Sequence, residues 1–179
     1  MANTKFDSFL DKHAPPPNDA PVDWDACREE WVERLNRLFA TISDYLSPYA
    51  EGGKIRLTRN KKEISEEYIG RYNAPTLGIS IGLAQVQLVP VARYIIGAGG
   101  RVDMIGPSGI IRLLVLPKDA KTINVVVQQV LPGQPRSEPP KLPPYAEWEW
   151  KIASAPPKIR FTQLDKDSFF SALMECVGE

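Results

Sequence analysis

The chain has 179 residues, which is enough for one domain with a sizeable hydrophobic core, and 43% of them are hydrophobic. Basic and acidic residues number 22 each, so no net charge draws the chain toward nucleic acid or an anionic membrane. One histidine and two cysteines are too few for a clustered zinc or copper site or for thiol catalysis, and we expect no cofactor.

Signals for export and for membrane insertion are missing from the sequence. No apolar run approaches the roughly 18–20 residues that span a bilayer. The first residues do not combine a basic segment with an apolar one, as a secretory signal would. Two cysteines, Cys27 and Cys176, make a poor disulfide framework. We therefore expect a cytoplasmic protein that does not contact membranes.

The charges are unevenly distributed along the chain. Residues 1–50 contain nine acids and five bases, whereas residues 51–131 contain eleven bases and six acids. We favour the interpretation that an acidic helical part neutralises a basic sheet part of the same chain. The alternative is an accessory subunit that binds nucleic acid through the basic region, although no binding motif accompanies these bases.

Residues 1–22 are predicted to form an extended arm, because four prolines between residues 15 and 21 prevent a helix from continuing. The arm carries three large apolar residues, Phe6, Phe9 and Leu10. Such residues are unfavourable in water, so we expect them to dock on the chain itself or on a partner. The remainder, residues 23–179, is predicted to be a single domain.

A long helix is predicted from an N-cap at Asp23 to about Ser47, just before Pro48. Apolar residues recur every three or four positions and form one stripe, which we expect to cover a sheet. Two Glu-to-Arg pairs at i,i+4 are expected on the opposite side, Glu30 with Arg34 and Glu33 with Arg37.

From Lys54 onward the apolar period changes from helical to twofold, which predicts strands. The expected strands are separated by Gly, Asn and Pro signals, and the short links favour an antiparallel meander of about six to eight strands. The glycine-rich stretch at 97–100 is interpreted as a hairpin turn, since no helix follows it to bind a phosphate. The expected ranges are 54–59, 63–69, 76–81, 84–96, 101–106, 109–117, 122–131 and 145–152.

The hairpin across residues 101–117 can be assigned a register. With a two-residue turn between Gly106 and Gly109, Asp103 lies opposite Arg112, and we expect these two to form an ion pair. One side then collects apolar residues for the core. The other side is mixed and carries candidate partner-binding residues: Arg101, Asp103, Ile105 and Arg112.

Six prolines mark residues 131–145 as an extended crossover. Its end, Leu142, Pro143, Pro144 and Tyr145, also matches a short motif that aromatic grooves bind, so these four are further candidate partner-binding residues. A C-terminal helix is predicted after residue 164, capped by Asp165 or Thr162.

One pattern indicates an enzyme. Glu149 and Lys151 form an acid-x-Lys pattern on a strand, and Asp103 or Glu67 could supply the second acid that a Mg²⁺-dependent nuclease would need. The pattern is short, and a solvent-exposed strand face explains it as well.

The sequence thus predicts an α+β fold with a long N-terminal helix, an antiparallel meander and a C-terminal helix, both helices on one sheet face. The function we expect is non-enzymatic binding of another protein, as an adaptor, an inhibitor or immunity-type partner, or a small subunit of an assembly. A Mg²⁺-dependent nuclease and a nucleic-acid-binding subunit are the alternatives.

Overall fold

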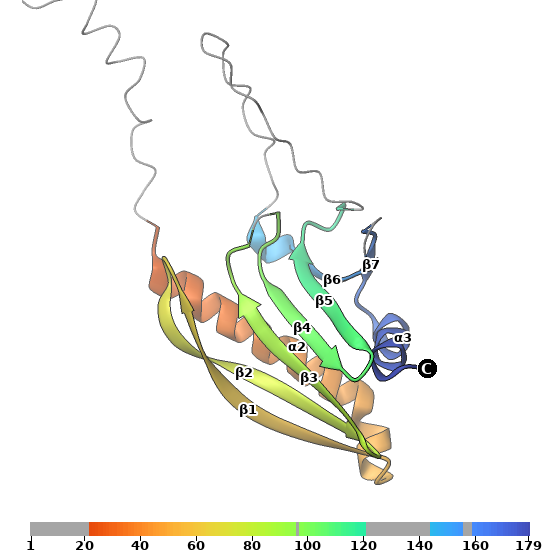
Figure 1. The fold of residues 1–179 in the computed structure, drawn as a ribbon. Helices are drawn as coiled ribbons and strands as arrows, with labels where there is room; N and C mark the ends of the chain where they lie inside the picture. The colour runs from red at the N-terminus through yellow and green to blue at the C-terminus, as the bar shows by residue number, and fades with distance from the viewer. Residues whose placement is uncertain (1–21, 96, 121–143, 156–158) are drawn as a thin grey trace, which may run out of the picture.

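The computed structural model describes residues 22–95, 97–120, 144–155 and 159–179. Within them, a long helix precedes seven strands, and a short helix follows (Figure 1). The predicted arm with Phe6, Phe9 and Leu10, the strand expected at 122–131, and Leu142 and Pro143 all lie outside these ranges. None of the helices in the described part has both the length and the apolar character needed to cross a membrane.

The seven described strands form one sheet in which every neighbour is antiparallel and the order follows the sequence, so the predicted meander is confirmed. A 3-10 turn, η1 (Tyr145–Glu147), precedes the sixth strand. The strands are β1 (Ile55–Glu66), β2 (Gly70–Ile81), β3 (Ala84–Ala92), β4 (Arg101–Gly106), β5 (Gly109–Leu116), β6 (Glu149–Ala153) and β7 (Phe161–Gln163).

Two expected strands, 54–59 and 63–69, are one continuous strand in the structure, so that division was wrong. The chain does not turn at Asn60 and the two lysines after it. Their side chains are all exposed, and an edge strand accommodates exposed polar and charged residues. The turn falls at 67–69 instead, and Gly70 follows it with a φ of 81°, a conformation that favours glycine.

The long helix α2 (Trp24–Glu51) begins as predicted, with the Asp23 side chain accepting a hydrogen bond from the Ala26 amide at 2.9 Å. The prediction ended the helix just before Pro48, but the helix includes Pro48 and ends one turn later, at Glu51. Proline lacks the N–H that would reach the carbonyl of Asp44. The Ser47 hydroxyl donates to that carbonyl at 3.0 Å, so the Asp44 oxygen keeps a hydrogen-bond donor that Pro48 cannot supply.

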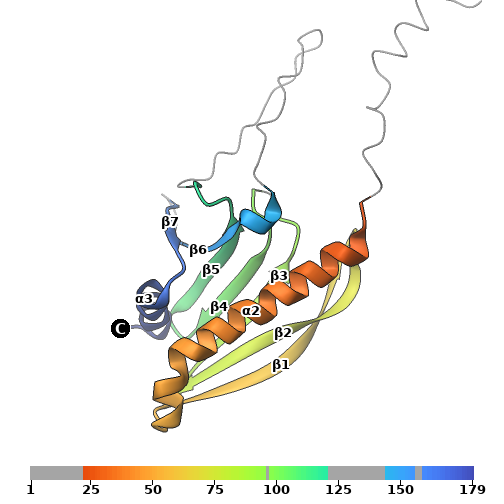
Figure 2. The ribbon, with the colours of Figure 1, turned by 180° about the vertical axis from the view of Figure 1, so that it is seen from behind.

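Both helices pack on the same face of the sheet, as predicted (Figure 2). Trp31 and Phe39 of α2 are fully buried against Met104 and Leu113 of the sheet, and so is Phe169 of α3 (Lys166–Val177). The opposite face of β3, β4 and β5 is not covered by either helix (Figure 1).

β1 and the first half of β2 extend beyond the rest of the sheet as a two-stranded ribbon. β3 pairs with β2 only from Leu77 to Ile81, whereas β1 pairs with the whole of β2. Ala74 and Pro75 are adjacent and both buried, so the side of the ribbon that faces the core changes at this point. Two-stranded ribbons twist strongly, which lets this one follow α2 along its length (Figure 2).

Candidate functional site

The uncovered face of β3, β4 and β5, which we call the open sheet face, contains most of the predicted binding residues that the structure describes. Its members alternate with core residues along each strand, as a half-buried sheet requires. They are Gln87, Val89 and Val91 of β3, Arg101, Asp103 and Ile105 of β4, and Ile110 and Arg112 of β5.

The predicted register of β4 and β5 is confirmed at each pair, including Asp103 opposite Arg112. The expected ion pair between these two was wrong. Asp103 binds Arg101 through two hydrogen bonds of 2.6 and 2.7 Å, because Arg101 lies two residues away on the same side of the same strand. The guanidinium of Arg112 is exposed and has no acid partner among the described residues.

Apolar side chains lie between these charges. Ile105 and Ile110 are direct cross-strand neighbours, and 40% and 56% of their surfaces are exposed. Val91 on β3 is 39% exposed. An ordered carboxylate–guanidinium pair, a free guanidinium and half-exposed aliphatic side chains therefore share one continuous surface.

At the other end of the same face, a second apolar cluster is closed by loops. Leu114, Leu116 and Ala153 are buried there beneath Ile95 and Phe161. Lys151 lies on this side of β6 and is only 6% exposed. Its ammonium group donates hydrogen bonds to the carbonyl oxygens of Lys118 and Ala120, so it holds the chain that leaves β5.

The residues of the nuclease hypothesis are not brought together. Asp103 is bound to Arg101, and Lys151 is bound to two carbonyl oxygens, while Glu149 lies half-buried on β6. β5 separates the strand of Asp103 from the strand of the other two. In the described part of the chain, no group of three or more metal-ligating side chains lies close enough together to hold an ion.

Tyr145, the last residue of the predicted motif, lies between two arginines. The guanidinium of Arg93 is 3.5 Å from the ring centroid, and that of Arg34 is 4.3 Å from it. The tyrosine hydroxyl donates to the carbonyl oxygen of Gly99 at 2.8 Å. Burial raises the pKa of Tyr145, although the charges of Arg93 and Arg34 oppose this. Within the motif, Pro144 is exposed.

The position of Tyr145 also explains why Arg34 does not pair with Glu30. The expected pair with Glu30 was wrong, because Arg34 donates to the carbonyl oxygens of Trp148 and Tyr145 at 2.7 and 3.0 Å instead. The other predicted pair, Glu33 with Arg37, is present at 3.5 Å.

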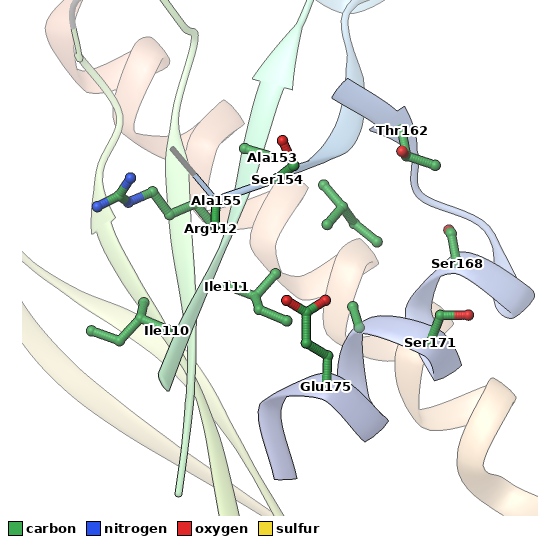
Figure 3. A pocket seen from close by; sticks show the side chains of 12 residues that line it. Ile110, Ile111, Arg112, Ala153, Ser154, Ala155, Thr162, Ser168, Ser171 and Glu175 are labelled. Atoms are coloured by element: carbon green, nitrogen blue, oxygen red, sulfur yellow. The ribbon is translucent and has the colours of Figure 1, made fainter. Parts of the chain in front are cut away.

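The open sheet face continues at Ile110 and Arg112 into a pocket of about 390 Å³, which we call the rim pocket. Residues 110–112 and 152–155 form one side of it, and α3 forms the other with Ala172 and Glu175. Figure 3 shows the Glu175 carboxylate extending from α3 into this space. The pocket therefore combines an apolar wall, from Ile111 and Ala172, with the Glu175 carboxylate and several hydroxyl-bearing residues, which are Ser154, Thr162, Ser168 and Ser171.

The sequence pattern did not single out Val89, Val91 or Glu175. Val89 and Val91 follow Gln87 at intervals of two residues, and this spacing was a signal that would have identified both as members of the open sheet face. Glu175 is supplied by a separate element, so no local pattern indicates its place. No protein-family model, curated protein or solved structure matches this chain.

Proposed function

We propose that this chain is a non-enzymatic interaction protein, an adaptor, an inhibitor or immunity-type partner, or a small subunit, that binds another protein through the open sheet face. The observation that carries the proposal is the exposed Ile105–Ile110 pair beside Arg112, which has no acid partner in the part of the chain that the structure describes. Exposed apolar surface marks a site of protein interaction, and arginine is enriched in protein interfaces and among the residues that contribute most to affinity.

Two features of this surface support a specific partner. The Arg101–Asp103 pair is already ordered in the chain, so little side-chain entropy is lost when a partner covers it. The rim pocket lies at the edge of the same face and can accept one side chain of the partner as an anchor.

Arg112→Glu tests the proposal most directly, because Arg112 is exposed and makes no ion pair whose loss would unfold the chain. We expect a partner captured from native lysate by the tagged wild-type protein to be lost with Arg112→Glu, and its affinity to fall at least tenfold. Arg101→Glu is a poorer test, since it removes the two hydrogen bonds that hold Asp103 as well as adding a carboxylate beside it, whereas Arg112→Glu adds a carboxylate across from Asp103 but breaks no ion pair seen in the described residues.

The matched control is Arg37→Glu, which makes the same charge change on α2 at an exposed position. A partner retained by Arg37→Glu and lost with Arg112→Glu supports the open sheet face. A partner whose affinity is unchanged by Arg112→Glu, and also by Ile110→Asp, would contradict it, provided that thermal unfolding shows both variants to be folded.

A further inference from the structure

The outer edge of β1 is a second surface with no partner in the described structure. β1 is the first strand of the sheet and has twelve residues, and it pairs only with β2. In an antiparallel strand, every second residue turns its backbone N–H and C=O away from the neighbouring strand. Ile81 and Ala84 flank a two-residue turn and form a hydrogen-bonded pair, so every second β2 residue counted back from Ile81 bonds to β3. The β2 residues in between bond to β1, and their partners there are the even-numbered residues. The odd-numbered residues of β1, which include Arg59 and Lys61, therefore turn their backbone groups outward.

The same edge is strongly basic. Six basic side chains lie on or beside the two-stranded ribbon, and all of them are exposed. Three ion pairs occur in the described part of the chain: Arg28–Asp25, Arg37–Glu33 and Arg101–Asp103. None joins α2 to the ribbon, so the neutralisation of the sheet by the acidic part of the chain stays a prediction. The six bases, which we call the basic ribbon residues, are Lys54, Arg56, Arg59, Lys61, Lys62 and Arg71.

Acids in the same segment reduce this positive charge but do not cancel it, because residues 54–71 contain six bases and three acids, Glu63, Glu66 and Glu67. Glu66 accepts hydrogen bonds from the backbone amides of Arg93 and Tyr94 and from the Tyr72 hydroxyl, so its carboxylate is engaged inside the chain. Glu63 is exposed on β1, and it forms no ion pair.

We propose that the edge of β1 binds an extended acidic segment of a partner protein, which adds to the sheet as a further antiparallel or parallel strand. Such a segment satisfies both features of the edge at once: its backbone completes the hydrogen-bond ladder, and its Asp or Glu side chains lie beside the basic ribbon residues. This proposal does not depend on the open sheet face.

Two other occupants fit less well. A second copy of the chain that paired β1 with β1 would bring Arg59, Lys61 and Lys62 close to the same residues of its neighbour, and like charges across strands are destabilising. A nucleic-acid strand would neutralise the bases, but it would leave the backbone N–H and C=O groups of the edge without strand-like partners.

The probe is a fluorescently labelled ten-residue peptide of alternating Glu and Thr, titrated with the full chain and followed by anisotropy. We expect saturable binding that Lys61→Glu with Lys62→Glu weakens at least tenfold. The control variant, Lys118→Glu with Lys166→Glu, makes the same charge change at exposed positions away from the ribbon, and it should bind like the wild type. Thermal unfolding checks that both variants are folded.

A second peptide separates strand addition from simple charge attraction. It has the same sequence with N-methylated backbone amides, so it keeps its charge but cannot complete the ladder, and we expect it not to bind. Hydrogen exchange at the outward amides of Arg59 and Lys61 should slow when the first peptide is bound.

The proposal is overturned if the first peptide does not bind. It is also overturned if the methylated peptide or a single-stranded oligonucleotide of equal charge binds as tightly, or if exchange at those two amides is unchanged. Failure of this experiment leaves the open sheet face untouched, because the Arg112→Glu test addresses a different surface.

Discussion

Arg93 is a buried cation that forms no ion pair with any residue the structure describes. Its side chain is 6% exposed, and its guanidinium lies over the ring of Tyr145 and donates to the carbonyl oxygen of Gly99 at 2.9 Å. The aromatic face and the carbonyl oxygen replace part of the hydration that the charge loses. A lysine would not serve equally well, because only the planar guanidinium can stack on the ring and donate sideways together.

Gly99 is the residue on which this cluster depends. A Cβ at this position would lie 2.5 Å from a ring carbon of Tyr145 and 2.9 Å from one of Trp148. We predict that Gly99→Ala lowers the free energy of unfolding by about 1–3 kcal/mol, as overpacking of a closed site does. Urea unfolding measures the change.

Gly78→Ala is the control, since its Cβ would meet Thr58 at 3.6–3.7 Å, an ordinary contact distance. Equal stability of the Gly99→Ala and Gly78→Ala variants would show that the Tyr145 cluster can move aside, and would contradict the close packing described here.

At the scale of elements, α3 is short and depends on its ends. A twelve-residue helix is marginal in isolation, so capping and packing must hold it. Asp165 accepts a hydrogen bond from the Ser168 amide at 2.8 Å, and the Ser168 hydroxyl accepts one from the Asp165 amide at 2.9 Å. Gly178 ends the helix with a φ of 108°. Because α3 forms one wall of the rim pocket, this cap also fixes the position of Glu175.

The cap predicts a stability that depends on pH. Hydrogen bonds from the Ser168 amide and hydroxyl lower the pKa of Asp165 below its ordinary value of 3.8. The folded state therefore favours the ionised carboxylate, so this contribution is present above pH 3.8 and is lost as the pH falls through the lowered pKa. We predict that Asp165→Ala lowers the midpoint of thermal unfolding at neutral pH, and that the difference from wild type shrinks in strong acid.

Asp167→Ala is the matched control for this prediction, because Asp167 lies in the first turn of the same helix without capping it. A deficit of Asp165→Ala that persists undiminished in strong acid would show that the cap is not the cause.

At the scale of the whole molecule, the helices cover one face of the sheet, and the two proposed binding surfaces lie elsewhere. The open sheet face is central and partly apolar, whereas the edge of β1 is peripheral and basic. The two surfaces differ in chemistry, so one partner that covers both would need an apolar part and an acidic part. Between them, Glu66 joins the end of β1 to the chain after β3, which fixes the ribbon relative to the rest of the sheet.

Two tyrosines, Tyr72 and Tyr94, predict that the folded protein loses stability at alkaline pH. Burial raises the pKa of Tyr72, with the hydrogen bond to Glu66 adding to the effect, and burial raises that of Tyr94 to about 12. The unfolded chain releases these protons near pH 10 while the folded chain retains them, so stability is full below pH 10 and falls as the pH rises above it. For Tyr72 the expected slope is about 1.4 kcal/mol per pH unit.

The measurement is urea unfolding of wild type and Tyr72→Phe at several pH values on both sides of 10. The variant loses a hydrogen bond to Glu66 and starts from a lower stability, but its stability should fall less steeply with pH. Parallel slopes for the two proteins would rule out the buried phenol as the cause.

Several features of the fold could be predicted because their causes are local. Asp23 caps α2 through an amide three residues away, and the β4–β5 register follows from one turn and the alternation beside it. A turn was wrongly predicted around Asn60, inside β1. Exposed polar residues continue along the strand there, and no sequence pattern distinguishes such an edge strand from a turn.

The sequence by itself determined most of the elements, the antiparallel meander and which side of the central hairpin faces the core, since each depends on residues within a few positions of one another. Tertiary structure alone decided the partners of Arg34, which are more than one hundred residues away, and the reason for glycine at positions 99 and 100. There, the rings of Tyr145 and Trp31 leave no room for a Cβ. Side-chain partners of this kind depend on where distant segments cross, and no local period or spacing carries that information.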